Sequence, residues 1–178
     1  MDETPLGRMV VRLAAAVAIA GGLSLAVATA VTVLSVIGRA LIPLRLGPIP
    51  GDFELVQAST LFAVFCFLPW CHLERGHAVV AILTDRLPAR LGAVMEFVWD
   101  VVMAIVAAFI AWRFAAGLLD KLANGESTFI LRIPLWVLYA GGMIGAATFV
   151  LVALYCAARS GRNALSTNPV APVSGGGE

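Results

Sequence analysis

The stretch Pro69-Trp70-Cys71-His72-Leu73-Glu74-Arg75-Gly76-His77 interrupts a chain that is otherwise strongly apolar. Its proline removes a helical hydrogen bond, and Gly76 supplies a backbone that can turn. The charged and histidine side chains on either side of Gly76 would be costly inside a bilayer if they stayed unpaired. We therefore expect the chain to leave the membrane at this turn, with two long hydrophobic segments before it and two after it.

The composition also indicates a membrane protein. The 178 residues are 61% hydrophobic and 13% charged, whereas a soluble domain is usually about half apolar and about a quarter charged. A net charge of +1 gives no reason to expect nucleic acid as a partner. The three cysteines are odd in number and lack CxxC spacing, so neither a disulfide framework nor a zinc site is expected.

Four segments are long enough to cross a bilayer as helices, since about 20 apolar residues suffice for one crossing. The predicted spans are residues 13–38, 55–73, 91–119 and 133–158. The prediction is an all-α integral membrane protein with a membrane domain over residues 13–159. Residues 1–12 form a short N-terminal segment, and residues 160–178 are expected to be a disordered tail rich in Pro, Gly and Ser.

The ends of the second and fourth spans carry helix signals. Asp52 is the expected N-cap of the second span, with Glu54 in its first turn. Pro69 should kink the last turn of that span, and Pro134 fits the first turn of the fourth span. Apolar residues at helical spacing within residues 79–87 suit a short helix at the membrane interface after the second span.

Small residues predict where helices approach one another closely. In the first span they recur every fourth residue, at Ala14, Ala18, Gly22 and Ala26. In the fourth span they form two pairs of the same spacing, Gly141 with Gly145 and Gly142 with Ala146.

The third span is the one with charges near its ends. Glu96 and Asp100 share a helix face, and Arg113 lies near the opposite boundary. Two interpretations are open. We favour charges that reach the membrane interface from a long, tilted helix, because neither acid is central in the span. The other interpretation is a proton or ion relay, since acids inside a membrane are functional candidates by default.

Basic residues predict the orientation, because they are more frequent in cytoplasmic loops. Four spans place both termini and the turn on one side, which has seven basic residues: Arg8, Arg12, Arg75, Arg86, Arg90, Arg159 and Arg162. The other side has five: Arg39, Arg45, Arg113, Lys121 and Arg132. The N- and C-termini are therefore expected in the cytoplasm.

The sequence has no pattern typical of an enzyme. It contains no Gly-rich phosphate loop, HExxH motif, nucleophile elbow or metal-ligand cluster. His72 and His77 lie close together at one helix end, so they cannot ligate a haem from facing spans. We expect an interfacial role for both histidines, no catalytic residue and no cofactor.

The order of short motifs is similar to that in the small permease subunit of tripartite ATP-independent periplasmic (TRAP) transporters, the DctQ-like family. Gly38-Arg39 closes the first span, and Gly51-Asp52-Phe53-Glu54-Leu55 opens the second, where many members carry Trp and paired Glu instead. The turn at Cys71-His72-Leu73-Glu74-Arg75-Gly76-His77, with Asp85 after it, resembles the family's basic-Gly-His turn. Gly125-Glu126-Ser127-Thr128, followed by Ile133-Pro134-Leu135-Trp136, resembles its entry to the fourth span.

This resemblance implies a subunit that packs against a much larger permease in the bacterial inner membrane. The large subunit carries the substrate and sodium sites, and a periplasmic binding protein delivers an organic acid or similar solute. The small subunit is then a scaffold with no cofactor of its own, in contact with membrane lipid and with no nucleic acid. The candidates for structural or partner-interface roles are Arg39, Asp52, Glu54, Arg75, Gly76, His77, Asp85, Glu96, Asp100, Arg113, Pro134, Gly22, Gly141 and Gly145.

Two other functions fit the residues. A self-sufficient proton-coupled transporter would use Glu96 or Asp100 as its coupling acid. A membrane anchor of a redox complex would need only the four spans.

Overall fold

The computed structural model describes residues 5–44, 46–74 and 89–166. In these residues the chain forms four long helices and one short 3-10 helix, in the order α1 (Pro5–Ala40), η1 (Ile42–Leu44), α2 (Asp52–Leu73), α4 (Ala89–Asn124) and α5 (Leu135–Ser166). Each long helix is apolar and long enough to cross a membrane. The prediction of an all-α membrane protein with four spans is confirmed. The predicted interfacial helix, with Arg75, Gly76, His77 and Asp85, lies outside the described residues.

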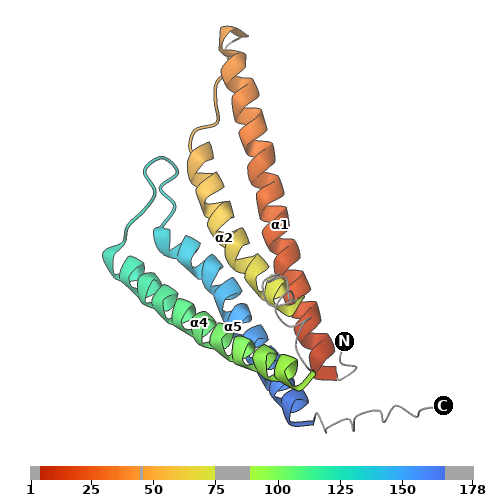
Figure 1. The fold of residues 1–178 in the computed structure, drawn as a ribbon. Helices are drawn as coiled ribbons and strands as arrows, with labels where there is room; N and C mark the ends of the chain where they lie inside the picture. The colour runs from red at the N-terminus through yellow and green to blue at the C-terminus, as the bar shows by residue number, and fades with distance from the viewer. Residues whose placement is uncertain (1–4, 45, 75–88, 167–178) are drawn as a thin grey trace, which may run out of the picture.

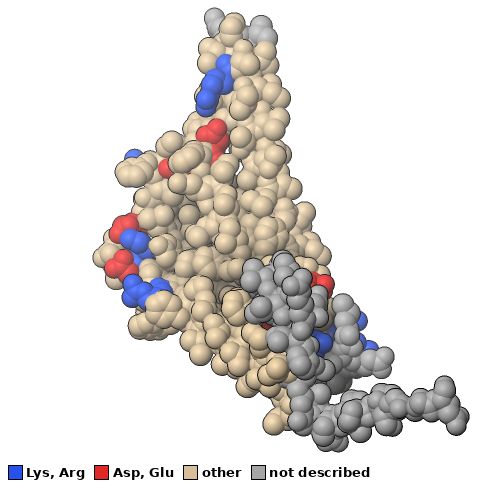
Figure 2. Space-filling model, viewed as in Figure 1, with Lys and Arg blue, Asp and Glu red and all other residues tan. Residues whose placement is uncertain are grey.

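The helices pack as a layer in which α2 and α5 are central. α1 packs along α2, α2 along α5, and α5 along α4. Figure 1 shows α1 and α4 at opposite edges of the layer, with both termini at one end of the molecule. On the face shown in Figure 2, charged side chains gather toward the two ends of the layer and along one edge, and the described surface in the middle is free of them.

The helices continue beyond the apolar segments. α1 begins at Pro5 rather than residue 13, and α5 continues through Ser166 rather than ending at residue 158. Pro5 fits a first helical turn because its missing N–H has no partner to lose there. Polar residues mark where the hydrocarbon ends, but they do not break a helix, so the spans predicted from hydropathy are shorter than the helices.

Small residues on α1 face α2 at intervals of seven. The buried residues of α1 are Gly7, Ala14, Gly21, Ala28 and Ser35. A Cβ atom added at Gly21 would lie 2.7 Å from the Cβ atom of Cys66 and 3.3 Å from the Cα atom of Ala63. Seven residues turn an α-helix to within about 20° of the starting direction, so this spacing keeps one face toward a neighbour.

The predicted four-residue stripe on α1 is therefore corrected. Of its members only Ala14 is buried, and a Cβ atom at Gly22 would have nothing within 4 Å. Each step of four residues rotates the helix face by about 40°, so the stripe turns away from α2. A role for Gly22 at the surface of a partner stays a prediction.

On α5, glycines bring α2 and α4 close. A Cβ atom at Gly145 would lie 2.6 Å from the backbone carbon and oxygen of Phe65. At Gly142 it would lie 2.8 Å from the ring of Phe114, whereas at Gly141 it would make ordinary contact with Phe62 at 3.5 Å. The tightest approach of α5 to α2 is therefore at Gly145.

Candidate functional site

One polar cluster joins α1 to the beginning of α2. The hydroxyl of Ser35 is fully buried and donates a hydrogen bond to Asp52 Oδ2 at 2.5 Å. The backbone N–H of Ile49 donates to Ser35 Oγ at 3.2 Å, and that of Phe53 donates to Asp52 Oδ1 at 2.8 Å. Asp52 was expected to cap α2, but the cap residue is Gly51, with φ of 80°. The Asp52 carboxylate instead links two helices.

Glu54 holds the connection between α4 and α5. Its Oε1 accepts a hydrogen bond from the N–H of Ile130 at 2.8 Å, and its Oε2 accepts one from the N–H of Leu131 at 2.9 Å. Charge-assisted bonds to successive backbone donors are stronger than neutral ones and fix the direction of the chain. Glu54 thereby fastens the α4–α5 connection to the first turn of α2.

The held connection is a narrow hairpin. Ser127 and Pro134 form an antiparallel bridge, and the N–H of Thr128 donates to the carbonyl of Ile133 at 2.9 Å. Pro134, expected in the first turn of the fourth helix, immediately precedes α5. The side chain of Leu131 packs against Gly51: a Cβ atom added at Gly51 would lie 2.5 Å from the Cγ atom of Leu131. Gly51 is required there both for its positive φ and for this space.

A second polar cluster is buried near the end of the molecule that carries the termini. His72 Nε2 lies 3.8 Å from Asp100 Oδ1, and the two residues are 3% and 9% exposed. The imidazole meets the ring of Phe149 edge-on, with 5.9 Å between the ring centroids. This pair connects α2 with α4 across α5.

The structure places both residues inside the helix layer, and their position at the membrane interface stays a prediction. His72 lies in the last turn of α2, which continues through the buried Pro69 and ends at Leu73, where the predicted second span also ends, and its side chain is buried in the helix layer. Asp100 lies on the same side of α4 as Ala104 and Ala107, the side that packs on α5. Its carboxylate therefore faces His72.

The remaining charged candidates are placed separately. Glu96 is half-buried one turn before Asp100, and Arg39 is exposed in the last turn of α1. Arg113 is exposed, with its guanidinium 5.9 Å from the centre of the Trp112 ring. Within the described ranges, no three His, Cys, Asp or Glu residues are grouped in a way that could hold a metal ion.

Both polar clusters fall within one family match. The model of the DctQ component of tripartite ATP-independent periplasmic transporters matches residues 28–163. The chain belongs to the DctQ family. Comparison with curated proteins and with solved structures gave no match. The small membrane subunit of a TRAP transporter, suggested by the motifs, is thus confirmed as the identity of this chain.

Three structural residues of this DctQ component were missed from the sequence. The spacing of Gly7, Ala14, Gly21, Ala28 and Ser35 is visible in the sequence as small residues every seven positions, and it would have placed both Gly21 and Ser35 on the packed face. His72 follows Ala63, Cys66 and Pro69 at intervals of three on the buried side of α2. That pattern would have placed it in the core.

Proposed function

We propose that this DctQ component is the fixed membrane scaffold of its transporter. It holds a large permease subunit in the bacterial inner membrane, with both termini in the cytoplasm. The large subunit takes up an organic acid or similar solute from a periplasmic binding protein, driven by a sodium gradient. The sodium and solute sites, and the class of solute, follow from the family resemblance and not from residues of this chain.

The observation that carries the proposal is the fixation of one turn of α2 from both sides. Gly21 of α1 lies against Ala63 and Cys66, and Gly145 of α5 lies against Phe65 and Cys66. Helices packed this closely cannot slide past each other without collisions, because the glycines at the contacts have no side chain that could move aside. The three helices are therefore expected to behave as one rigid body, as a scaffold requires.

The outer surfaces of the layer also support a role in assembly. Large apolar side chains on the edge helix α4, such as Ile105, Phe109 and Trp112, are each more than half exposed in the isolated chain. The edge helix α1 exposes Leu23 and Val27 in the same way. Such faces suit contact with lipid on one side and with a larger membrane subunit on the other.

The buried His72–Asp100 pair favours one alternative, a small proton-coupled transporter. A carboxylate in the helix layer next to an imidazole is the kind of pair that can move a proton. The alternative differs from the scaffold in one respect, because it requires this chain alone to move solute.

The test uses liposomes with imposed sodium and proton gradients. The purified chain alone should move none of the organic acids supplied, and uptake should appear when the large permease and the binding protein are added. The chain should also co-purify with the large permease. Gradient-driven uptake by the lone chain, lost in a folded Asp100→Asn variant, would show that the scaffold proposal is wrong.

A further inference from the structure

A cavity of about 190 Å3 opens between α1, α2 and α5 at the end that carries the termini. Arg8 and Arg12 border it from α1, and Arg159 borders it from α5. Glu74, directly after α2, is the one acidic residue among those that line it. Three arginines and one acidic residue among the lining residues favour an anionic occupant.

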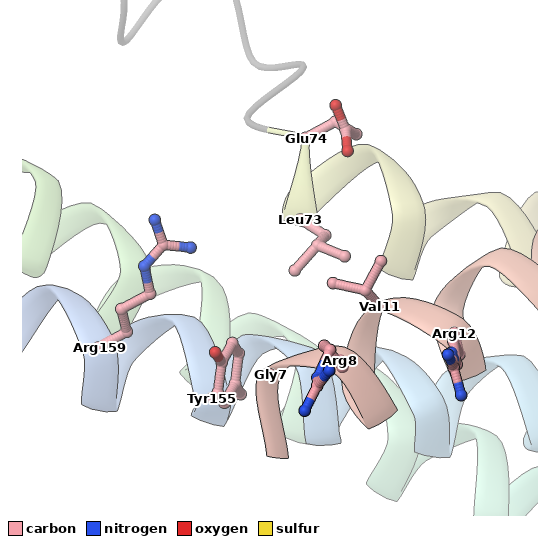
Figure 3. A pocket seen from close by; sticks show the side chains of 8 residues that line it. All are labelled: Gly7, Arg8, Val11, Arg12, Leu73, Glu74, Tyr155 and Arg159. Carbon is pink, nitrogen blue, oxygen red and sulfur yellow. The ribbon is translucent and has the colours of Figure 1, made fainter. Parts of the chain in front are cut away.

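The arginines come from two sides. Arg8 and Arg12 are four residues apart and so lie on one face of α1. Figure 3 shows Tyr155 between Arg159 on α5 and Arg8 on α1, with Leu73 and Val11 on the side of α1 opposite to the Arg8 and Arg12 guanidinium groups. An anion in the cavity would therefore contact cationic side chains of two helices that are distant in sequence.

The walls between the arginines are largely apolar. Val11 and Leu73 line the cavity together with the half-buried ring of Tyr155, which adds a hydroxyl. A small hydrated anion gains nothing from apolar walls. A phospholipid has both a phosphodiester, which suits the guanidinium groups, and a glycerol with acyl chains, which suits Val11 and Leu73.

The depth of the cavity fits a headgroup. Arg8 and Arg12 lie just before the uncharged run of residues 13–38, and Arg159 comes directly after the uncharged run of residues 133–158. These positions correspond to the membrane–water boundary, where arginines contact lipid phosphates. Basic pockets between membrane helices are known binding sites for anionic headgroups.

We propose that this cavity binds the headgroup of one anionic phospholipid, with its phosphodiester between Arg8 and Arg12 of α1 and Arg159 of α5. α1 and α5 touch each other along a much shorter stretch than either touches α2. The bound lipid would connect them at the end where the termini lie. This proposal is independent of the scaffold function, since it concerns lipid binding by the chain itself.

The test measures lipid binding to the full chain, purified alone in detergent, by native mass spectrometry. Phosphatidylglycerol, phosphatidylcholine and inorganic phosphate are the three probes. Phosphatidylglycerol should bind more tightly than zwitterionic phosphatidylcholine, and inorganic phosphate should not displace it. Equal binding of the two lipids, or displacement by inorganic phosphate at comparable concentration, would overturn the proposal.

The variants compare arginines within and outside the cavity. Arg159→Gln should weaken phosphatidylglycerol binding by about tenfold, the usual effect of losing one hydrogen bond to a charged group. Arg162→Gln is the matched control, because Arg162 is exposed on the same helix and does not line the cavity. An equal loss in both variants would indicate general attraction to a basic surface and would overturn the proposal.

Two further variants keep the test independent of folding. Arg8 and Arg12 are exposed, so the double substitution Arg8→Gln/Arg12→Gln should leave the fold intact and weaken binding at least as much as Arg159→Gln. Glu74→Gln removes the single acidic group and should leave binding as tight or tighten it. Unchanged binding in the folded double variant, or weaker binding after Glu74→Gln, would contradict the assignment.

Discussion

The middle of α2 and its two ends are held to the rest of the protein in different ways. In the middle, the turn at Cys66 lies against glycines of α1 and α5, so backbones meet without polar side chains. At the ends, Glu54 binds backbone N–H groups of the α4–α5 connection, and His72 faces Asp100. The packing around the middle of α2 leaves no room for an added atom, whereas the contacts at the two ends of α2 depend on charge and on hydrogen-bond partners.

The difference follows from where water can reach. Between helices in lipid there is little hydrophobic driving force, so association depends on close packing of small residues. Near the membrane boundary a backbone N–H must be satisfied by a side chain or by water, which favours carboxylates such as Glu54. The polar contact of Glu54, at the exposed beginning of α2, can thus be replaced in part by water, but a steric contact in the middle of α2 has no substitute.

The largest effect is expected from a bulky residue in the middle. In Gly145→Leu the new Cβ atom would lie 2.6 Å from the backbone carbon and oxygen of Phe65. Added atoms in a packed core usually cost about 1–3 kcal/mol, and more where backbone must move. We expect little folded protein, measured as the monodisperse peak in size-exclusion chromatography in detergent.

Adjacent glycines on α1 give the matched control. Gly21→Leu should behave like Gly145→Leu, because a Cβ atom there meets Cys66 at 2.7 Å. Gly22→Leu should leave the isolated chain folded, since a Cβ atom at Gly22 has nothing within 4 Å. Equal losses in the two variants would refute the seven-residue packing face of α1.

A smaller effect is expected where the buried pair is broken at the end of α2. His72→Ala removes the imidazole beside Asp100 and Phe149. Leaving a buried polar group without its partner costs about 1–3 kcal/mol, and His72 Nε2 lies 3.8 Å from Asp100 Oδ1. The free energy of unfolding in detergent should fall by about 2 kcal/mol for this reason.

A double-mutant cycle tests whether the two side chains act together. The double variant His72→Leu/Asp100→Leu should lose less stability than the sum of the two single variants, because it leaves no charge alone in the layer. Additive losses would show that His72 and Asp100 are not coupled. That outcome would also remove the main support for a proton-moving role.

The sequence predicted the spans because bilayer thickness sets the length of an apolar run, and it predicted the family because short motifs keep their order. It could not predict the contacts of Glu54, because its partners are backbone N–H groups 76 and 77 residues further along the chain. Every residue except proline carries the same backbone N–H group, so a sequence pattern cannot show which one a side chain binds. The burial of His72 was missed for a different reason: α2 ends at Leu73, as the predicted span does, but the polar residues Glu74, Arg75 and His77 that follow suggested an interfacial position for His72 as well.

The smallest effect is expected at the beginning of α2. Glu54→Gln keeps the shape of the side chain but leaves one acceptor oxygen for the two N–H groups of Ile130 and Leu131. Water can reach this exposed connection, so the cost should be small and local. Amide hydrogen exchange at Ile130 and Leu131 should rise by about fivefold, with little change in overall unfolding.

Glu126→Gln is the control, because the Glu126 carboxylate binds Lys121 Nζ at 2.9 Å and its loss should leave exchange at Ile130 and Leu131 unchanged. Unchanged exchange in Glu54→Gln would mean that the connection is held by its own hairpin bonds and not by α2.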